Sequence, residues 1–318
     1  MFKSSIPLLL FVSLGLLSGC GGGGAPGSAC GGASTSVVVP ASASNFGPTG
    51  QSVSLFLKDA PADNVLALRL DLCSAALQDA SGQQPTNSAT SPAPGPQDVE
   101  LRHLELSPTM VGRKSGLPAT EYQSVTLHFA NPRLMVLGQN GSVQSVSLSS
   151  HPAARLTSSM VKVPLSLNLP SAGNLGLMLD FDIQDSVRTD SSGNYLINPV
   201  VTASVLDGTS STGTLEDTQA KIVSSNAEGA DVMLLKSGQL IRLKTGPATL
   251  FDAQIANSSG LQPARYVALD AELQPDGTFL ATYIGSLPSD LSLDHHGLVT
   301  STRQLSPTSS AFQMVDWN

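Results

Sequence analysis

Alternation of apolar and polar residues with a period of two recurs along most of the chain. Between positions 66 and 72 four leucines fall on one face of an extended segment, whereas Arg69, Asp71 and then Cys73 fall on the other. Such alternation is typical of a strand with one buried and one exposed face. We therefore predict a half-buried strand here, with Cys73 on the face opposite the leucines.

The same period predicts further strands over residues 125–129, 161–169 and 175–183. Pro164 lacks the backbone N–H that a central strand needs, so we expect the strand over 161–169 to lie at a sheet edge. No segment keeps a helical period over three turns. These patterns predict an all-β fold.

Polar segments rich in turn-forming residues separate the strands. We expect a long loop over 81–97, a tight hairpin turn at Asn140-Gly141 and another turn over 190–194. The small polar segment 206–213 is the predicted domain boundary. The first domain, a β-sandwich, is thus expected over residues 50–206.

A second β unit follows this boundary. Five short strands at this spacing predict a small β-barrel-like domain over residues 213–286. The predicted strands cover residues 221–223, 232–235, 240–244, 266–273 and 279–284.

Residues 287–318 form a tail with two apolar runs, Leu298-Val299 and 312–315. These runs predict two strands. A lone two-stranded hairpin is marginally stable in water, so we expect the tail to dock on the second domain.

The N-terminus carries one cation, Lys3, and an apolar run from Ile6 to Leu17. A positive start, a short apolar core and small residues before the cleavage point are the features of a secretory signal. Ser18-Gly19 precede Cys20 as in the lipobox of bacterial lipoprotein precursors, which this segment resembles. The resemblance implies a signal peptide over 1–19, cleavage before Cys20, a diacylglycerol on its sulfur and an acyl chain on the new amine.

Such an anchor predicts that the protein lies in the cell envelope and that the membrane is one of its partners. Several acyl chains bind a bilayer far more firmly than one chain does. Gly21 occupies the position where Asp would favour inner-membrane retention in enteric bacteria, so we expect the outer membrane of a bacterial cell envelope. Residues 20–49 are dominated by Gly, Ala, Ser and Pro and predict a flexible tether.

Composition and charge agree with an exported β protein. Hydrophobic residues make up 41% of the chain and charged residues only 13%, while 29 glycines and 21 prolines indicate many turns. The net charge is -8, and removal of Lys3 with the signal makes it -9. Because lysines and arginines are not clustered, the sequence argues against nucleic-acid binding.

Cys30 and Cys73 remain once Cys20 is assigned to the anchor. An oxidising compartment permits a disulfide between them. The alternative is a buried Cys73 and a free Cys30 within the tether. The sequence leaves both open.

Two groups of aspartates are candidates for calcium: Asp180, Asp182 and Asp185, and Asp59 with Asp63. Calcium needs roughly six to eight oxygens from defined loop positions. Neither group has such a spacing, so we predict solvated strand-face or turn-capping carboxylates, with Asp59 accepting backbone hydrogen bonds in a turn.

Other chemistry has weaker sequence support. Asp294-His295-His296 is a poor zinc motif, because adjacent histidines on an extended chain point in opposite directions. His103, His128 and His151 have no ligand spacing. The chain has no Gly-x-Ser-x-Gly elbow, no Cys-x-x-Cys and no phosphate-binding glycine motif, so we expect no enzyme activity, metal or cofactor. Its aromatic content of 4% argues against stacking on sugars.

Four ordered segments resemble the uncharacterised family catalogued as domain of unknown function 4382, which occurs in bacterial lipoproteins. The resemblance covers about residues 50–206 and implies localisation and fold rather than chemistry. Thr120-Glu121 departs from the family pattern, which more often has glycine before the tyrosine. Residues 213–285 resemble a second uncharacterised family of small β domains more weakly. The four segments are 55–63, 117–122, 179–182 and 195–200.

The leading functional hypothesis is a non-enzymatic binding, adhesive or structural module whose ligand is a protein or polymer. The alternative is a hydrolase of envelope or extracellular polymer.

Overall fold

Strands dominate the structure, a computed structural model that describes residues 30, 52–60, 65–82, 89–90, 97–105, 108–118, 120–138, 141–169, 174–206, 213–288, 297–306 and 309–316. The all-β prediction is confirmed. The predicted signal peptide and, apart from Cys30, the predicted tether lie outside these residues, as do Asp63 and the Asp294-His295-His296 group. Within the described ranges, no helix has the length and apolar character needed to cross a membrane.

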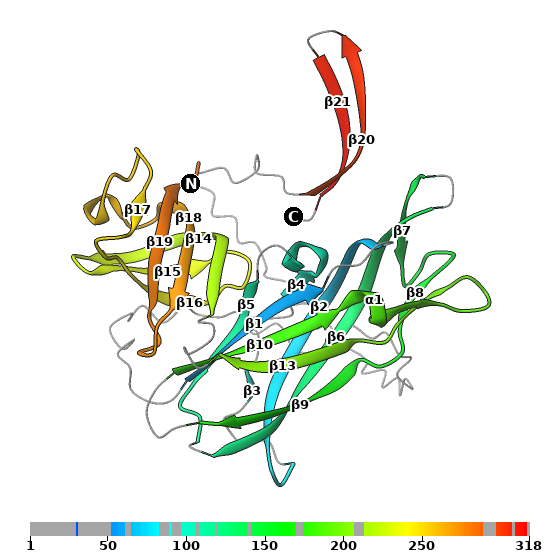
Figure 1. Cartoon of the computed structure of the whole chain (residues 1–318), viewed down its shortest axis with the longest axis horizontal. Coiled ribbons are helices and arrows are strands. Elements are labelled where there is room, and N and C mark those ends of the chain that lie inside the picture. Colours follow the sequence, from blue (N-terminus) through cyan, green and yellow to red (C-terminus); the bar gives the residue numbers. More distant parts are fainter. Residues whose placement is uncertain are drawn as a thin grey trace, which may run out of the picture.

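The first domain is a sandwich of two sheets (Figure 1). In sheet A, β1 runs parallel to β10 and the other neighbours are antiparallel. The strand order in sheet A is β13 (Val200–Leu206), β10 (Asn174–Asp182), β1 (Ser52–Ala60) and β5 (Thr109–Ser115). Sheet B contains β3 (Ala89–Thr90), β2 (Val65–Asp79), β6 (Glu121–Leu137) and β7 (Val143–Ser147), with β4 (Gln97–Glu100) beside β2 and β9 (Met160–Asn168) beside β6.

Apolar side chains from the two sheets form one core between them. Phe129 of β6 and Phe181 of β10 meet edge to face, with ring centroids 5.9 Å apart. This geometry is the one that aromatic pairs prefer. Sheet A contributes Val53, Leu55, Leu57, Leu177 and Leu179, and sheet B contributes Leu68, Leu70, Leu72, Leu77, Val125 and Leu127.

The alternation in β2 has the predicted outcome for three of the four leucines. Leu68, Leu70 and Leu72 are buried in the sandwich, whereas Arg69, Asp71 and Cys73 are partly exposed on the outer face of sheet B. Leu66 lies in a separate small cluster with Ala67, because the pairing of β2 with β6 shifts register between Val65 and Ala67. Among the described pairings β9 bonds to β6 alone, so the strand with Pro164 lies at a sheet edge as predicted.

The structure also shows turns at the predicted places. Asn140 lies outside the described residues, but Gly141, between β6 and β7, has a φ of +75°, a conformation that glycine adopts without strain, and its amide donates to the Gly138 carbonyl at 2.8 Å. In the turn after β11 (Val187–Thr189), the Asp190 carboxylate accepts hydrogen bonds from the amides of Ser192 and Asn194. The bonds from Asn194 lower the pKa of Asp190. β11 joins β12 (Tyr195–Ile197) and β8 (Ala154–Leu156) in a small third sheet.

The expected loop over 81–97 is a partial error. β3 lies inside it and pairs with Ala75 and Ala76 of β2, and Gln97 begins β4. The 3-10 helix Arg102–Glu105 and β5 were not predicted either. The helix, β3 and β4 are too short for a periodic pattern. β5 has seven residues but does not alternate, because Met110 packs in the core of the second domain and the adjacent Val111 packs in the sandwich.

The second domain contains a closed ring of strands. Its path runs β16 (Leu240–Lys244), β15 (Gly229–Leu234), β14 (Thr214–Asn226), β18 (Tyr266–Leu273) and β19 (Phe279–Ser286), with the short β17 (Leu250–Phe251) beside β19. β16 pairs with β19 and closes the ring. The predicted barrel-like domain is therefore confirmed, and its interior holds Ile222, Val232, Leu269, Phe279 and Ile284.

An apolar contact joins the two domains. The Phe56 side chain points out of sheet A, away from the sandwich core, and is fully buried in the core cluster of the second domain. Its ring centroid lies 6.4 Å from that of Phe279. A Cβ on residue 213 would overlap the Phe56 ring, so the close approach requires glycine there. Met110, Met178 and Leu206 of sheet A extend the same contact.

Two turns of the second domain add polar contacts to this interface. In the turn between β15 and β16, the Ser237 carbonyl accepts a hydrogen bond of 3.2 Å from Gln97 of β4. In the turn between β18 and β19, the Pro275 carbonyl accepts from the backbone and side-chain nitrogens of Asn174, each at 3.3 Å. The pKa of Lys236, next to Ser237, is lowered. Burial lowers it, and the charge of Glu100 offsets only part of this effect. The contact therefore involves the face of sheet A and the β4 edge of sheet B.

Acid should destabilise the turn between β18 and β19, because protonation of Asp276 removes a charge that is bonded there. Burial alone would raise the pKa of Asp276, but hydrogen bonds from Lys244 and Thr278 outweigh it and lower the pKa to about 2. Because this value lies below the unfolded value of about 3.9, the contribution is complete above the unfolded pKa and is lost as the pH falls towards 2. We expect Asp276→Asn to lose less stability than the parent between pH 5 and pH 2.5, measured by urea unfolding. Equal losses in the two proteins would contradict this assignment.

The C-terminal strands form a hairpin of their own. β20 (Gly297–Ser306) and β21 (Ser309–Asp316) pair with each other and with no other described strand, and Figure 1 shows the hairpin extending away from both domains. Val299 is 50% exposed and Phe312 65% exposed. The prediction of two strands is thus confirmed, but the structure differs from the expected docking: pairing within the tail satisfies the backbone and leaves this apolar face uncovered.

Candidate functional site

The outer face of sheet B carries a network of charged side chains. Arg69 of β2 donates through Nε and Nη2 to the carboxylate of Asp98 on β4, at 3.2 and 2.7 Å. Arg133 of β6 donates to Asp71 at 2.9 Å and to Asp98 at 2.8 Å. Two arginines and two aspartates therefore link three strands without a net charge. Pairs as exposed as these each contribute little to stability, about 1 kcal/mol or less.

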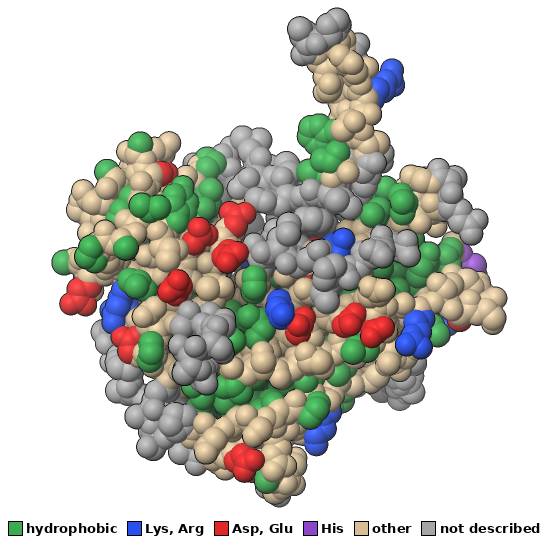
Figure 2. All heavy atoms as spheres, in the orientation of Figure 1, with side chains coloured by type: hydrophobic (Ala, Val, Ile, Leu, Met, Phe, Trp, Pro, Cys, Tyr) green, Lys and Arg blue, Asp and Glu red, His purple; other side chains and the backbone are tan. Residues whose placement is uncertain are grey.

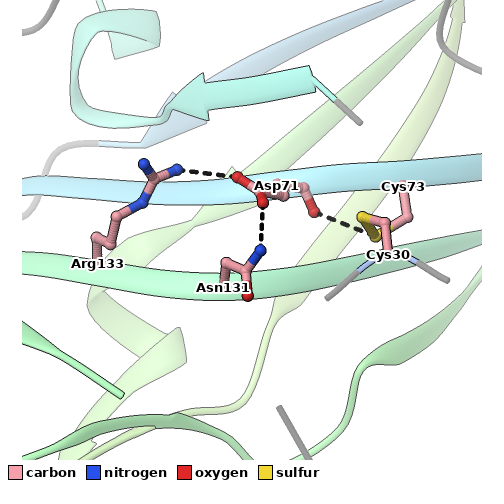
Figure 3. Close-up of a disulfide and its surroundings, with 5 residues drawn as sticks. All are labelled: Cys30, Asp71, Cys73, Asn131 and Arg133. Carbon is pink, nitrogen blue, oxygen red and sulfur yellow. Dashed lines mark hydrogen bonds and ion pairs between the residues drawn. A yellow bond between two sulfur atoms is a disulfide. The ribbon is translucent and has the colours of Figure 1, made fainter. Parts of the chain in front are cut away.

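Asn131 completes this network beside the disulfide (Figure 3). Its Nδ2 donates to Oδ2 of Asp71 at 2.6 Å. Asn131 has a φ of +48°, a backbone conformation that asparagine tolerates better than most residues. It lies where the pairing of β2 with β6 shifts register. The irregularity in β6 thus directs the amide towards Asp71.

Cys30 and Cys73 form a disulfide on the same face, with their Cα atoms 5.4 Å apart. Of the two alternatives that the sequence left open, the structure contains the pair. Cys73 projects from β2 two residues beyond Asp71, as the alternation predicts. The bridge fastens residue 30, more than twenty positions before the first strand, to sheet B.

A shallow hollow of about 330 Å³ adjoins this network. Asn131 and Arg133 form one side, and the end of β7 with the two residues after it forms the other, through Ser147, Leu148 and Ser149. All four carboxylate oxygens of Asp71 and Asp98 accept hydrogen bonds within this network, from Arg69, Asn131 and Arg133.

The second domain has an acidic hollow of about 400 Å³. Irregularities in β14 and β18 shape it, and the Asp217 amide donates to Oδ1 of Asp270 at 2.8 Å across the two strands. Glu216 and Glu272 also line it. Figure 2 shows acidic side chains gathered over this domain. Within the described ranges, no group of three or more His, Cys, Asp or Glu side chains is arranged to hold a metal ion.

The aspartates considered for calcium have protein partners. Asp180 forms an ion pair of 2.8 Å with Lys58, and Asp182 caps the one-turn helix α1 (Ile183–Ser186) by accepting from the Asp185 amide at 2.9 Å. The prediction that Asp59 lies in a turn is wrong: β1 continues to Ala60, and Asp59 is 6% exposed and pairs with Phe181 of β10. The amides proposed as its partners lie outside the described residues.

Residues 50–199 match the sequence profile of the family described as Domain of unknown function (DUF4382). The chain therefore contains a domain that resembles this family. The resemblance noted from the four ordered segments is thereby confirmed. No curated protein matches the sequence.

The structural domain extends beyond the match. β13 follows residue 199 and pairs with β10 at the edge of sheet A. Leu206, its last residue, packs against the second domain. In this chain the DUF4382 sandwich is therefore completed by a strand that also builds the interface.

Proposed function

We propose that this protein is a lipid-anchored component of the bacterial cell envelope and that its two β domains act as a non-enzymatic binding, adhesive or structural module. The observation that carries the proposal is the N-terminal pattern: a positive start, an apolar core, and Ser18-Gly19 directly before Cys20. The ligand is a protein or polymer outside the cytoplasm.

The disulfide supports this compartment. Disulfides persist in secreted and envelope proteins and are rare in the reducing cytosol. Cys30 and Cys73 are bridged. With Cys20 acylated on its sulfur, the mature protein would contain no free thiol, because the chain has three cysteines.

The candidate surfaces support binding rather than catalysis. On sheet B the carboxylates of Asp71 and Asp98 accept from Arg69, Asn131 and Arg133. Both hollows are shallow and are lined mainly by residues of strands, β14, β18 and β19 in the second domain and β6 with the end of β7 on sheet B. Rigid surfaces with satisfied polar groups recognise partners at a low entropic cost.

Replacement of Cys20 tests the anchor. We expect the parent to partition into detergent and the Cys20→Ala variant to remain unprocessed or to become soluble, because the variant lacks the acceptor sulfur. Phase partitioning of cell extracts measures this difference. A variant that partitions into detergent like the parent would show that Cys20 is not the site.

Replacement of Gly21 tests whether the protein is sorted to the outer membrane. In an enteric host the parent should fractionate with the outer membrane, and Gly21→Asp should shift it towards the inner membrane. Gly22→Asp is the matched control, since it adds the same charge one position later. A parent found only with the inner membrane would overturn the outer-membrane assignment.

A further inference from the structure

The disulfide fastens the N-terminal segment to one particular face of the protein. Cys73 lies on the outer face of sheet B, beside Asp71 and Asn131 (Figure 3). The apolar part of the second domain interface lies on a different face, the outer side of sheet A. The chain between Cys20 and the folded body therefore ends on sheet B.

The bridge also shortens the connection to Cys20. Ten residues separate Cys20 from Cys30, and an extended chain of that length spans at most about 35 Å. The next residue that the structure describes is Ser52, 32 positions after Cys20, and an extended chain of that length spans at most about 110 Å. The disulfide thus reduces the largest possible distance between Cys20 and the body about threefold.

The bridge changes the exit point as well. Ser52 is buried at the start of β1, where it bonds to Asn174, the residue that also contacts the turn of the second domain. The start of β1 therefore lies beside the domain interface. Cys30, the described residue nearest to Cys20 in sequence, is bonded to sheet B instead.

We propose that the Cys30–Cys73 disulfide holds the outer face of sheet B towards the membrane, so that lipid headgroups are the surface this face meets. The proposal rests on the proposed lipid anchor at Cys20. It assigns an orientation: sheet B lies nearest the bilayer, and sheet A and the exposed end of the second domain lie farther from it.

The chemistry of this face suits a headgroup layer. Arg69, Arg133, Asp71 and Asp98 form a polar network of zero net charge, so an anionic membrane does not repel it. Met160 of β9 adds an apolar side chain that is 61% exposed. Its strand partner His128 pairs in turn with Ser74, next to Cys73, so Met160 lies two strands from the bridge.

Energy transfer to labelled lipid tests the orientation. The full lipidated protein would carry a donor dye on an azide-bearing amino acid at position 160, or at the matched position 250, since Leu250 of the second domain is 67% exposed. It would be reconstituted into phosphatidylethanolamine and phosphatidylglycerol vesicles with an acceptor dye on a small fraction of headgroups. Transfer from position 160 should exceed transfer from position 250 by about twofold or more, because the short connection keeps sheet B close to the lipid.

Two variants test the cause of that difference. A Gly-Ser insertion of about twenty residues after Gly24 keeps the disulfide and lengthens the connection to a span of about 105 Å. The double variant Cys30→Ser with Cys73→Ser removes the bridge and the sheet B exit point. In both, transfer from position 160 should fall towards that from position 250. The insertion leaves the folded domains unchanged, so it remains informative if the double variant does not fold.

The outcomes separate the two proposals. Protein that does not float with the vesicles overturns the lipid anchor, and this inference with it. Protein that floats but shows equal transfer from the two positions, or more from position 250, leaves the anchor intact and overturns the orientation. Protein that floats with high transfer from position 160 regardless of the insertion also overturns it, because a separate membrane or protein contact would then hold sheet B in place.

Discussion

Replacing Phe56 with alanine should uncouple the two domains. Phe56 is fully buried, yet its side chain leaves the sandwich to which its strand belongs and packs in the core of the second domain beside Phe279. Truncation of a buried phenylalanine typically costs about 3–5 kcal/mol. In Phe56→Ala the free energy that is lost is that of the contact between the two domains. We expect the parent to unfold in one calorimetric transition and Phe56→Ala to show two.

Phe129→Ala is the matched control. Phe129 is equally buried but packs on Phe181 within the sandwich. It should lower the stability of the first domain by a similar amount without exposing the interface. Proteolysis between residues 206 and 213 should accelerate in Phe56→Ala far more than in Phe129→Ala. If both variants unfold in one transition and are cleaved equally, Phe56 does not couple the domains.

Removal of the disulfide should have the second large effect. The bridge joins cysteines 43 positions apart, and closing a loop of that length stabilises the folded state by about 4 kcal/mol in the chain-entropy treatment. The double variant Cys30→Ser with Cys73→Ser should lose stability on this scale in urea unfolding. The parent without reductant should leave Cys30 and Cys73 unreactive towards alkylating reagents. A loss well below about 1 kcal/mol would show that the bridge does not constrain the unfolded chain.

The strand pattern of this chain could be predicted where one face is buried. In β2, Leu68, Leu70 and Leu72 occupy the core and Arg69, Asp71 and Cys73 occupy the outer face, because a single buried face imposes a period of two. The missing backbone N–H of Pro164 separately predicted that β9 lies at an edge. Alternation could not predict β3 or β4, because their few residues contain no full period.

The domain interface left a signal that alternation alone does not reveal. Leu55, Phe56 and Leu57 are consecutive apolar residues, and so are Leu177, Met178 and Leu179. Such runs are typical of strands buried on both faces. In the structure the leucines face the sandwich, whereas Phe56 and Met178 face the second domain.

The candidate site was predictable only in part. Alternation placed Cys73 beside Asp71 and Arg69, and the expected compartment permitted a bridge. The partner of Cys73 and the ion pairs with Asp98 and Arg133 depend on which strands become neighbours, and a single sequence does not contain that information. The left-handed Asn131 has no periodic signature either.

The mass of the N-terminal peptide of the mature protein shows directly whether Cys20 is lipidated. Proteolysis of protein extracted from membranes should release a peptide that begins at Cys20 and carries a diacylglycerol on the sulfur and an acyl chain on the amine. A peptide that contains Cys20 with a free thiol, or that begins at any other residue, would show that the protein is not anchored through Cys20.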